Sequence, residues 1–154
     1  TLPLLVIGVM MLFFLALLQQ LLFGGGGAAG QQGPSHPIVE WLADSDWRGR
    51  LQLFVMACIA APIVEETMFR GVLYRQLRDA TFRWSVGTSI VVAALINSFV
   101  FAVIHPQGWL AVPALMSLAI GFSLLREWRG SLLASMTAHG INNAMATSVF
   151  FIFF

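Results

Sequence analysis

Long apolar blocks, separated by short polar clusters, run along most of this chain. The pattern predicts five helical segments, at about residues 2–23, 50–79, 84–105, 109–126 and 131–154. Each is long enough to cross the hydrocarbon core of a bilayer, which takes roughly 17–25 helical residues. The sequence therefore predicts an all-α, polytopic transmembrane helix bundle with about five spanning helices, organised as a single membrane-embedded domain over residues 1–154.

The segments outside these helices have a different composition. Residues 24–37, GGGGAAGQQGPSHP, are typical of a flexible loop, and His36 within them is expected to be solvated. Residues 38–48 mix tryptophans with acids, as segments at a membrane–water interface do, so residues 24–48 are predicted to lie outside the membrane. The chain starts with Thr1 rather than methionine and ends in FFIFF, and we expect it to be trimmed or partial.

Composition supports the membrane assignment. Hydrophobic residues make up 58% of the chain and charged residues 10%, against about a quarter charged in soluble domains. The net charge of +1 and the absence of a basic stripe give no sign of nucleic-acid binding. The single cysteine, Cys58, excludes an internal disulfide and, within an apolar run, is expected to serve packing. We expect a multi-pass integral membrane protein surrounded by lipid, in a bacterial cell membrane.

The arginines predict the orientation of the helices. They cluster in two connections that alternating spans place on one side of the bundle, and the positive-inside rule makes that side cytoplasmic. The residues are Arg75, Arg78 and Arg83, and Arg126 and Arg129.

Three charges in PIVEETMFRG, residues 62–71, lie within the second apolar segment. An ionised side chain at the bilayer centre costs at least about 2.5–3.5 kcal/mol, so such residues usually face the bundle interior and have a function. Glu66 and Arg70 are four residues apart and can pair on one helix face. Glu65 is rotated about 100° from Glu66 and has no such partner. This favours Glu65 for chemistry and the Glu66–Arg70 pair for support, although a purely structural network of the three charges remains open. Pro62 is expected to kink this helix near the two glutamates.

Two further segments carry polar residues at helical spacing. Phe101 and His105 are four residues apart in SFVFAVIHP, and His139 and Asn143 are four apart in AHGINNAM. A carboxylate, two imidazoles and an amide in one bundle interior supply a base for water, a group to orient that water, and donors for an oxyanion. Each histidine, taken alone, is also compatible with simple packing.

Together these motifs resemble the signature of the CPBP, or Abi, intramembrane proteases, which include the type II CAAX prenyl endopeptidases and bacteriocin-processing or self-immunity proteins. The resemblance covers residues 62–143, a predicted catalytic region that includes Pro62 and the Phe69-Arg70-Gly71 sequence. It implies a membrane-embedded glutamic-type endopeptidase without a metal or other cofactor, which acts on a membrane-associated protein or peptide. It also implies roles for individual residues: Glu65 activates water, His105 holds it, His139 and Asn143 form the oxyanion hole, and Glu66, Arg70 and Phe101 support them.

Other functions remain open at this point. Glu65, His105 and His139 form a set that can hold zinc with one open position, which would make the reaction metal-dependent. The polar residues can instead join helices in a non-enzymatic immunity or scaffold protein, or relay protons in a transporter. The sequence contains no G-x-S-x-G, no H-E-x-x-H and no phosphate-binding loop, so it lacks local support for a serine hydrolase, a familiar zinc protease or an NTPase.

Overall fold

The structure, a computed structural model, describes residues 45–153, and this part of the chain is built from helices and short connections. The elements are α3 (Trp47–Val55), the π-helical η1 (Met56–Ala60), α4 (Ala61–Glu66), the π-helical η2 (Thr67–Leu73), α5 (Tyr74–Ala80), α6 (Val86–Ile104), the 3₁₀ turn η3 (Trp109–Ala111), α7 (Val112–Arg129) and α8 (Leu132–Phe153). The predicted all-α class is confirmed.

Three helices in the described part are long and apolar enough to cross a membrane: Trp47–Ala80, Val86–Ile104 and Trp109–Arg129. They correspond to the second, third and fourth predicted segments, and the chain is an integral membrane protein. Helix α8 coincides with the fifth predicted segment, but it is not among these three helices. The first predicted segment and the loop with His36 lie outside the described residues, so the count of five stays a prediction.

Local sequence signals explain where several helices begin and end. Asp46 precedes α3 and accepts a hydrogen bond from the Gly49 N–H at 2.9 Å, and Ser85 caps α6 through the Thr88 N–H at 3.2 Å. Both are side-chain caps that satisfy otherwise unpaired N–H groups of a first helical turn. Helix α7 ends at Gly130, whose φ of 62° is a left-handed conformation that glycine adopts without a Cβ clash.

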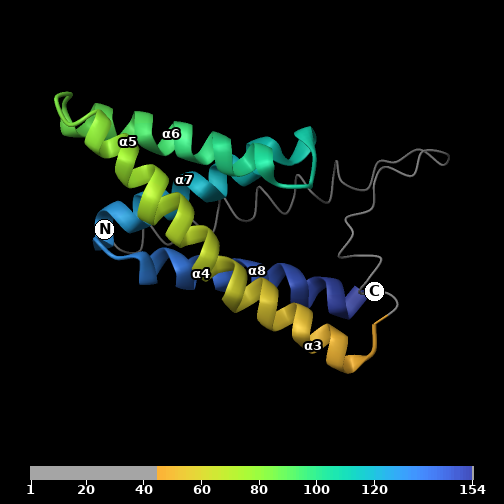
Figure 1. The fold of residues 1–154 in the computed structure, drawn as a ribbon. Helices are drawn as coiled ribbons and strands as arrows, with labels where there is room; N and C mark the ends of the chain where they lie inside the picture. The colour runs from red at the N-terminus through yellow and green to blue at the C-terminus, as the bar shows by residue number, and fades with distance from the viewer. Residues whose placement is uncertain (1–44, 154) are drawn as a thin grey trace.

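Residues 47–80 form one continuous helix across which the other helices pack (Figure 1). Pro62 does not interrupt it; the backbone remains right-handed helical, with wider π-helical segments on either side of α4. Helices α6 and α7 pack side by side, α5 packs on α6, and α8 lies against η1, α4 and α7. The helix with the two glutamates therefore lies between the two histidine-bearing segments.

A polar cluster joins α5, α6 and α7 at the arginine-rich end. Tyr74, which is fully buried, donates to Glu127 at 3.1 Å, and Arg78 pairs with Glu127 at 3.0 Å and also bonds Ser89. The α5–α6 and α7–α8 connections therefore lie at the same end of the bundle, as the alternation of predicted spans requires.

Helix α8 lies in close contact with η1 at Gly140. A Cβ at this position would lie 2.5 Å from the backbone carbonyl oxygen of Cys58, which is part of a helix and cannot move aside as a flexible side chain would. A side chain at residue 140 is thus incompatible with the present separation of the two helices.

Replacing Gly140 with alanine is therefore expected to destabilise the protein by about 1–3 kcal/mol, the usual effect of overpacking. Titration of the purified protein with a denaturing detergent, followed by circular dichroism, measures the effect. Gly87→Ala is the matched control, because nothing lies within 4 Å of its added Cβ. Equal stability of the two variants would contradict this account of the α8–η1 contact.

Candidate active site

Two adjacent carboxylates at the end of α4 have different surroundings. The Glu66 side chain has no exposed surface, whereas 29% of the Glu65 side chain is exposed. The difference follows from the rotation of about 100° between neighbouring helical residues, which turns Glu66 into the bundle and Glu65 toward a more open side. The predicted separation of the two glutamates into different environments is confirmed.

Glu66 and Arg70 form the predicted ion pair, with 3.0 Å between Glu66 Oε1 and Arg70 Nη1 and no exposed surface on either side chain. Arg70 Nη2 also donates to the backbone carbonyl of Ala119 in α7 at 2.8 Å. A buried charge needs a partner and hydrogen bonds to be tolerated, and the Arg70 guanidinium supplies both to Glu66. It also ties the glutamate-bearing helix to α7.

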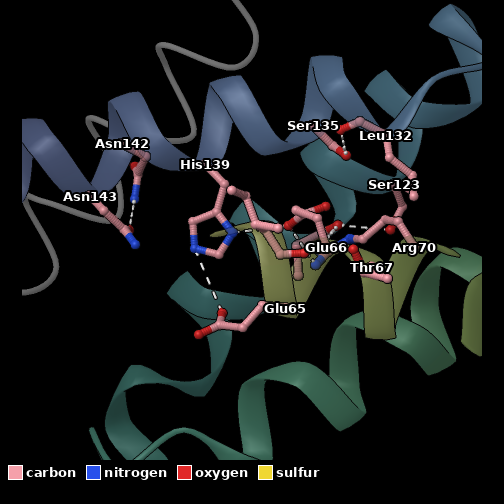
Figure 2. A network of polar contacts seen from close by, with 12 residues as sticks. Glu65, Glu66, Thr67, Arg70, Ser123, Leu132, Ser135, His139, Asn142 and Asn143 are labelled. Atoms are coloured by element: carbon pink, nitrogen blue, oxygen red, sulfur yellow. Dashed lines mark hydrogen bonds and ion pairs between the residues drawn. The ribbon is translucent and has the colours of Figure 1, made fainter. Parts of the chain in front are cut away.

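The two histidines meet at Glu65. Nε2 of His105, which follows the last residue of α6, lies 3.6 Å from Glu65 Oε2, and Nε2 of His139 in α8 lies 3.8 Å from the same oxygen. Figure 2 shows His139 extending from α8 toward Glu65 and Glu66. The structure thus brings together Glu65 of the long helix, His105 at the end of α6 and His139 of α8, three residues that the sequence analysis singled out.

Hydrogen bonds on the far side of each ring determine where the imidazole protons lie. His105 Nδ1 is 2.6 Å from the Phe101 carbonyl oxygen, which can only accept, so Nδ1 carries a proton. His139 Nδ1 is 2.9 Å from Glu66 Oε1 and donates to it when Glu66 is ionised. In their neutral forms both rings therefore present the Nε2 lone pair to Glu65 Oε2. Acceptors that face each other require a proton or a donor between them.

Aromatic rings surround this cluster. Phe101, which is buried, has its ring centre 4.1 Å from that of His105 and 4.9 Å from Arg70 Cζ. Phe122 of α7 stacks on His139 at 4.9 Å and lies 5.4 Å from Arg70 Cζ. The sequence analysis missed Phe122, because a phenylalanine in an apolar helix carries no signal that separates it from ordinary packing.

Asn143 lies one turn beyond His139 on α8, with Asn142 beside it (Figure 2). The Asn143 Nδ2 donates to the backbone carbonyl of Ala57 in η1 at 2.9 Å, and the same nitrogen carries a second N–H. Asn142 Nδ2 lies 3.4 Å from Asn143 Oδ1. The bond to Ala57 was not predicted from sequence, since it depends on how α8 packs against η1.

Within the described residues, no group of three or more His, Cys, Asp and Glu side chains has the geometry of a metal site. The three residues of the zinc hypothesis are close together, but only Glu65 Oε2 is near both Nε2 atoms, and each Nδ1 is already hydrogen-bonded. Metal dependence is decided by whether a chelator abolishes activity.

A family model described as "Type II CAAX prenyl endopeptidase Rce1-like" matches residues 47–145. This range includes all three motifs and nearly two thirds of the chain. The chain belongs to this family. The resemblance noted from the motifs is confirmed, and the Rce1-like chain is a hydrolase of the CAAX-protease type. No curated protein and no solved structure matches it.

Proposed function

We propose that this Rce1-like protein is an intramembrane endopeptidase that hydrolyses a peptide bond of a membrane-associated protein or peptide, with water activated by Glu65. One observation carries the proposal: Glu65 Oε2 is buried without a hydrogen-bond partner and lies 3.6 and 3.8 Å from the Nε2 atoms of His105 and His139. A buried carboxylate oxygen that has no hydrogen-bond partner and lies beside two imidazole rings suits a proton-transfer site.

In the proposed reaction Glu65 accepts a proton from water while His105 orients that water through Nε2. The water oxygen attacks the peptide carbonyl carbon and forms a tetrahedral intermediate. When the C–N bond breaks, the proton held by Glu65 passes to the leaving amine, so the products are a carboxylic acid and an amine. Because water is the nucleophile, no acyl-enzyme forms.

The charges of the site support His139 as an oxyanion donor. His139 can donate from Nε2 only when both ring nitrogens are protonated, since Nδ1 is directed to Glu66. With His139 protonated, the carboxylates of Glu65 and Glu66 balance the imidazolium and the Arg70 guanidinium. A buried cluster that is neutral overall avoids the large cost of an uncompensated charge. The second N–H of Asn143 is the other proposed donor.

The proposal is tested by incubating the purified protein, in lipid vesicles, with membrane-anchored peptides that carry or lack a prenyl group. We expect a new amino terminus, detected by mass spectrometry, at a rate that a chelator does not change. Loss of cleavage on chelation, restored by zinc, would instead support a metal-dependent protease that uses Glu65, His105 and His139. Failure to cleave any anchored peptide would favour the immunity or scaffold function. Comparing the two peptides reveals whether the substrate must be prenylated.

A further inference from the structure

The hydrogen bond between Asn143 and Ala57 joins two segments that are 86 residues apart in the chain. It is unusual because its acceptor is a main-chain carbonyl inside a continuous helix. Such carbonyls are normally bonded by the N–H four residues later, or five residues later in a π-helical turn. The bond to Asn143 therefore indicates that the Ala57 carbonyl lacks its usual backbone donor, and the local sequence must explain why.

Pro62 supplies that reason. The N–H four residues after Ala57 belongs to Ala61, and it donates to the Met56 carbonyl in the π-helical pattern of η1. The residue five positions after Ala57 is Pro62, which has no N–H. Both backbone donors that could reach the Ala57 carbonyl are thus lost, one to the π-helical shift and one to proline.

We propose that Pro62 is a positioning residue that makes the Ala57 carbonyl available to Asn143. Pro62 is buried in the middle of the long helix, three residues before Glu65, rather than at the start of an isolated helix where proline is common. Its missing N–H leaves an acceptor on the face that α8 contacts, and the Asn143 amide fills it at 2.9 Å.

The consequence for the site is a fixed Asn143 side chain. One N–H of the amide is held by Ala57, so the orientation of the other N–H is set by the same plane. His139, one turn earlier on α8, contacts Glu65 and Glu66 of the same long helix. Pro62 therefore helps to position His139 and Asn143 relative to Glu65 and Glu66. This consequence, unlike the hydrogen bond itself, rests on the proposed function.

A double-mutant cycle on stability tests the link without requiring any substrate. Asn143→Ala in the wild-type background leaves the Ala57 carbonyl unpaired, and we expect the unfolding equilibrium constant to rise about tenfold. In a Pro62→Ala background the new N–H at residue 62 can bond that carbonyl, so the same change should raise the constant about twofold or less. The constants come from detergent-denaturation titrations followed by circular dichroism.

Pro113→Ala replaces Pro62→Ala in the matched control cycle. Pro113 lies in the first turn of α7, and its replacement supplies no donor to the Ala57 carbonyl, so Asn143→Ala should keep its full tenfold effect in that background. An equal effect of Asn143→Ala in the Pro62→Ala and wild-type backgrounds would overturn the proposal.

Kinetics distinguish positioning from a contribution to stability alone. On a peptide that the wild type cleaves, Pro62→Ala and Asn143→Ala should each lower kcat with little change in KM, and the double variant should lose little more than Asn143→Ala. If the loss of kcat in the double variant equalled the product of the losses in the two single variants, the positioning role would be overturned. If the wild type cleaves no peptide, the proposed function fails, while the stability cycle still decides whether Pro62 and Asn143 are linked.

Discussion

Glu65→Gln is expected to lower kcat for cleavage of a membrane-anchored peptide by about 10²–10⁴-fold, the range for loss of a general base. Glutamine keeps the size and shape of the side chain, but its neutral amide cannot take a proton from water. Folding should be preserved, since Glu65 is partly exposed and has no arginine within ion-pair distance. The measurement is a steady-state rate in lipid vesicles, accompanied by a denaturation titration.

The matched control for this variant is Asp79→Asn. Asp79 is an exposed carboxylate on α5 of the same long helix, remote in sequence from the two motif glutamates. Its conversion to the amide should leave both the rate and the stability within about twofold of wild type. A Glu65→Gln protein that cleaves at the wild-type rate would remove Glu65 from the reaction and with it the proposed mechanism.

Arg70→Met is expected to cost about 3–5 kcal/mol of folding free energy, because it leaves the Glu66 carboxylate buried without its counter-charge. It also removes the hydrogen bond from Arg70 to the Ala119 carbonyl. Adding Glu66→Gln to this variant should recover a large part of the loss, since the remaining group is then neutral. Detergent-denaturation titration of the two variants measures both effects.

Arg75→Met serves as the control for Arg70→Met. Arg75 is exposed on α5, one turn beyond Arg70, and its replacement should change stability by no more than about 0.5 kcal/mol. If Arg70→Met were no less stable than Arg75→Met, the buried ion pair would not be the support for Glu66 that its geometry indicates. Failure of Glu66→Gln to rescue would show that the bond to Ala119, rather than the charge pair, is the larger contribution.

Glu65→Gln and Arg70→Met also distinguish the role of the Glu65 carboxylate from that of the Glu66 carboxylate. Glu65→Gln should affect rate and spare stability, whereas changes at Arg70 and Glu66 should affect stability first. This contrast follows from burial: the Glu66 side chain is fully buried and 29% of the Glu65 side chain is exposed. We therefore expect the same residue type to serve a different purpose at two adjacent positions.

The features that could be predicted from the amino-acid sequence are those that depend on helix length and local helical geometry. Apolar blocks of spanning length indicated the helical membrane protein, and spacing of four residues paired Glu66 with Arg70 and placed Phe101 beside His105. The different environments of Glu65 and Glu66 followed from the rotation between neighbouring residues. These predictions succeeded because each involves residues within about one turn, whose relative positions are set by the backbone alone.

The contacts between helices could not be predicted from the sequence and became known only from the folded arrangement. These contacts depend on how α6, α7 and α8 are rotated and how closely they pack. They include the approach of both imidazoles to Glu65, the bond from His139 to Glu66, the stacking of Phe122 on His139, and the bond from Asn143 to Ala57. A helical pattern tells which face of a helix is polar but leaves its rotation and depth against a neighbour undetermined. The sequence does not show that Gly140 allows close approach or that Pro62 leaves a free carbonyl for Asn143, because both depend on the contact between α8 and η1.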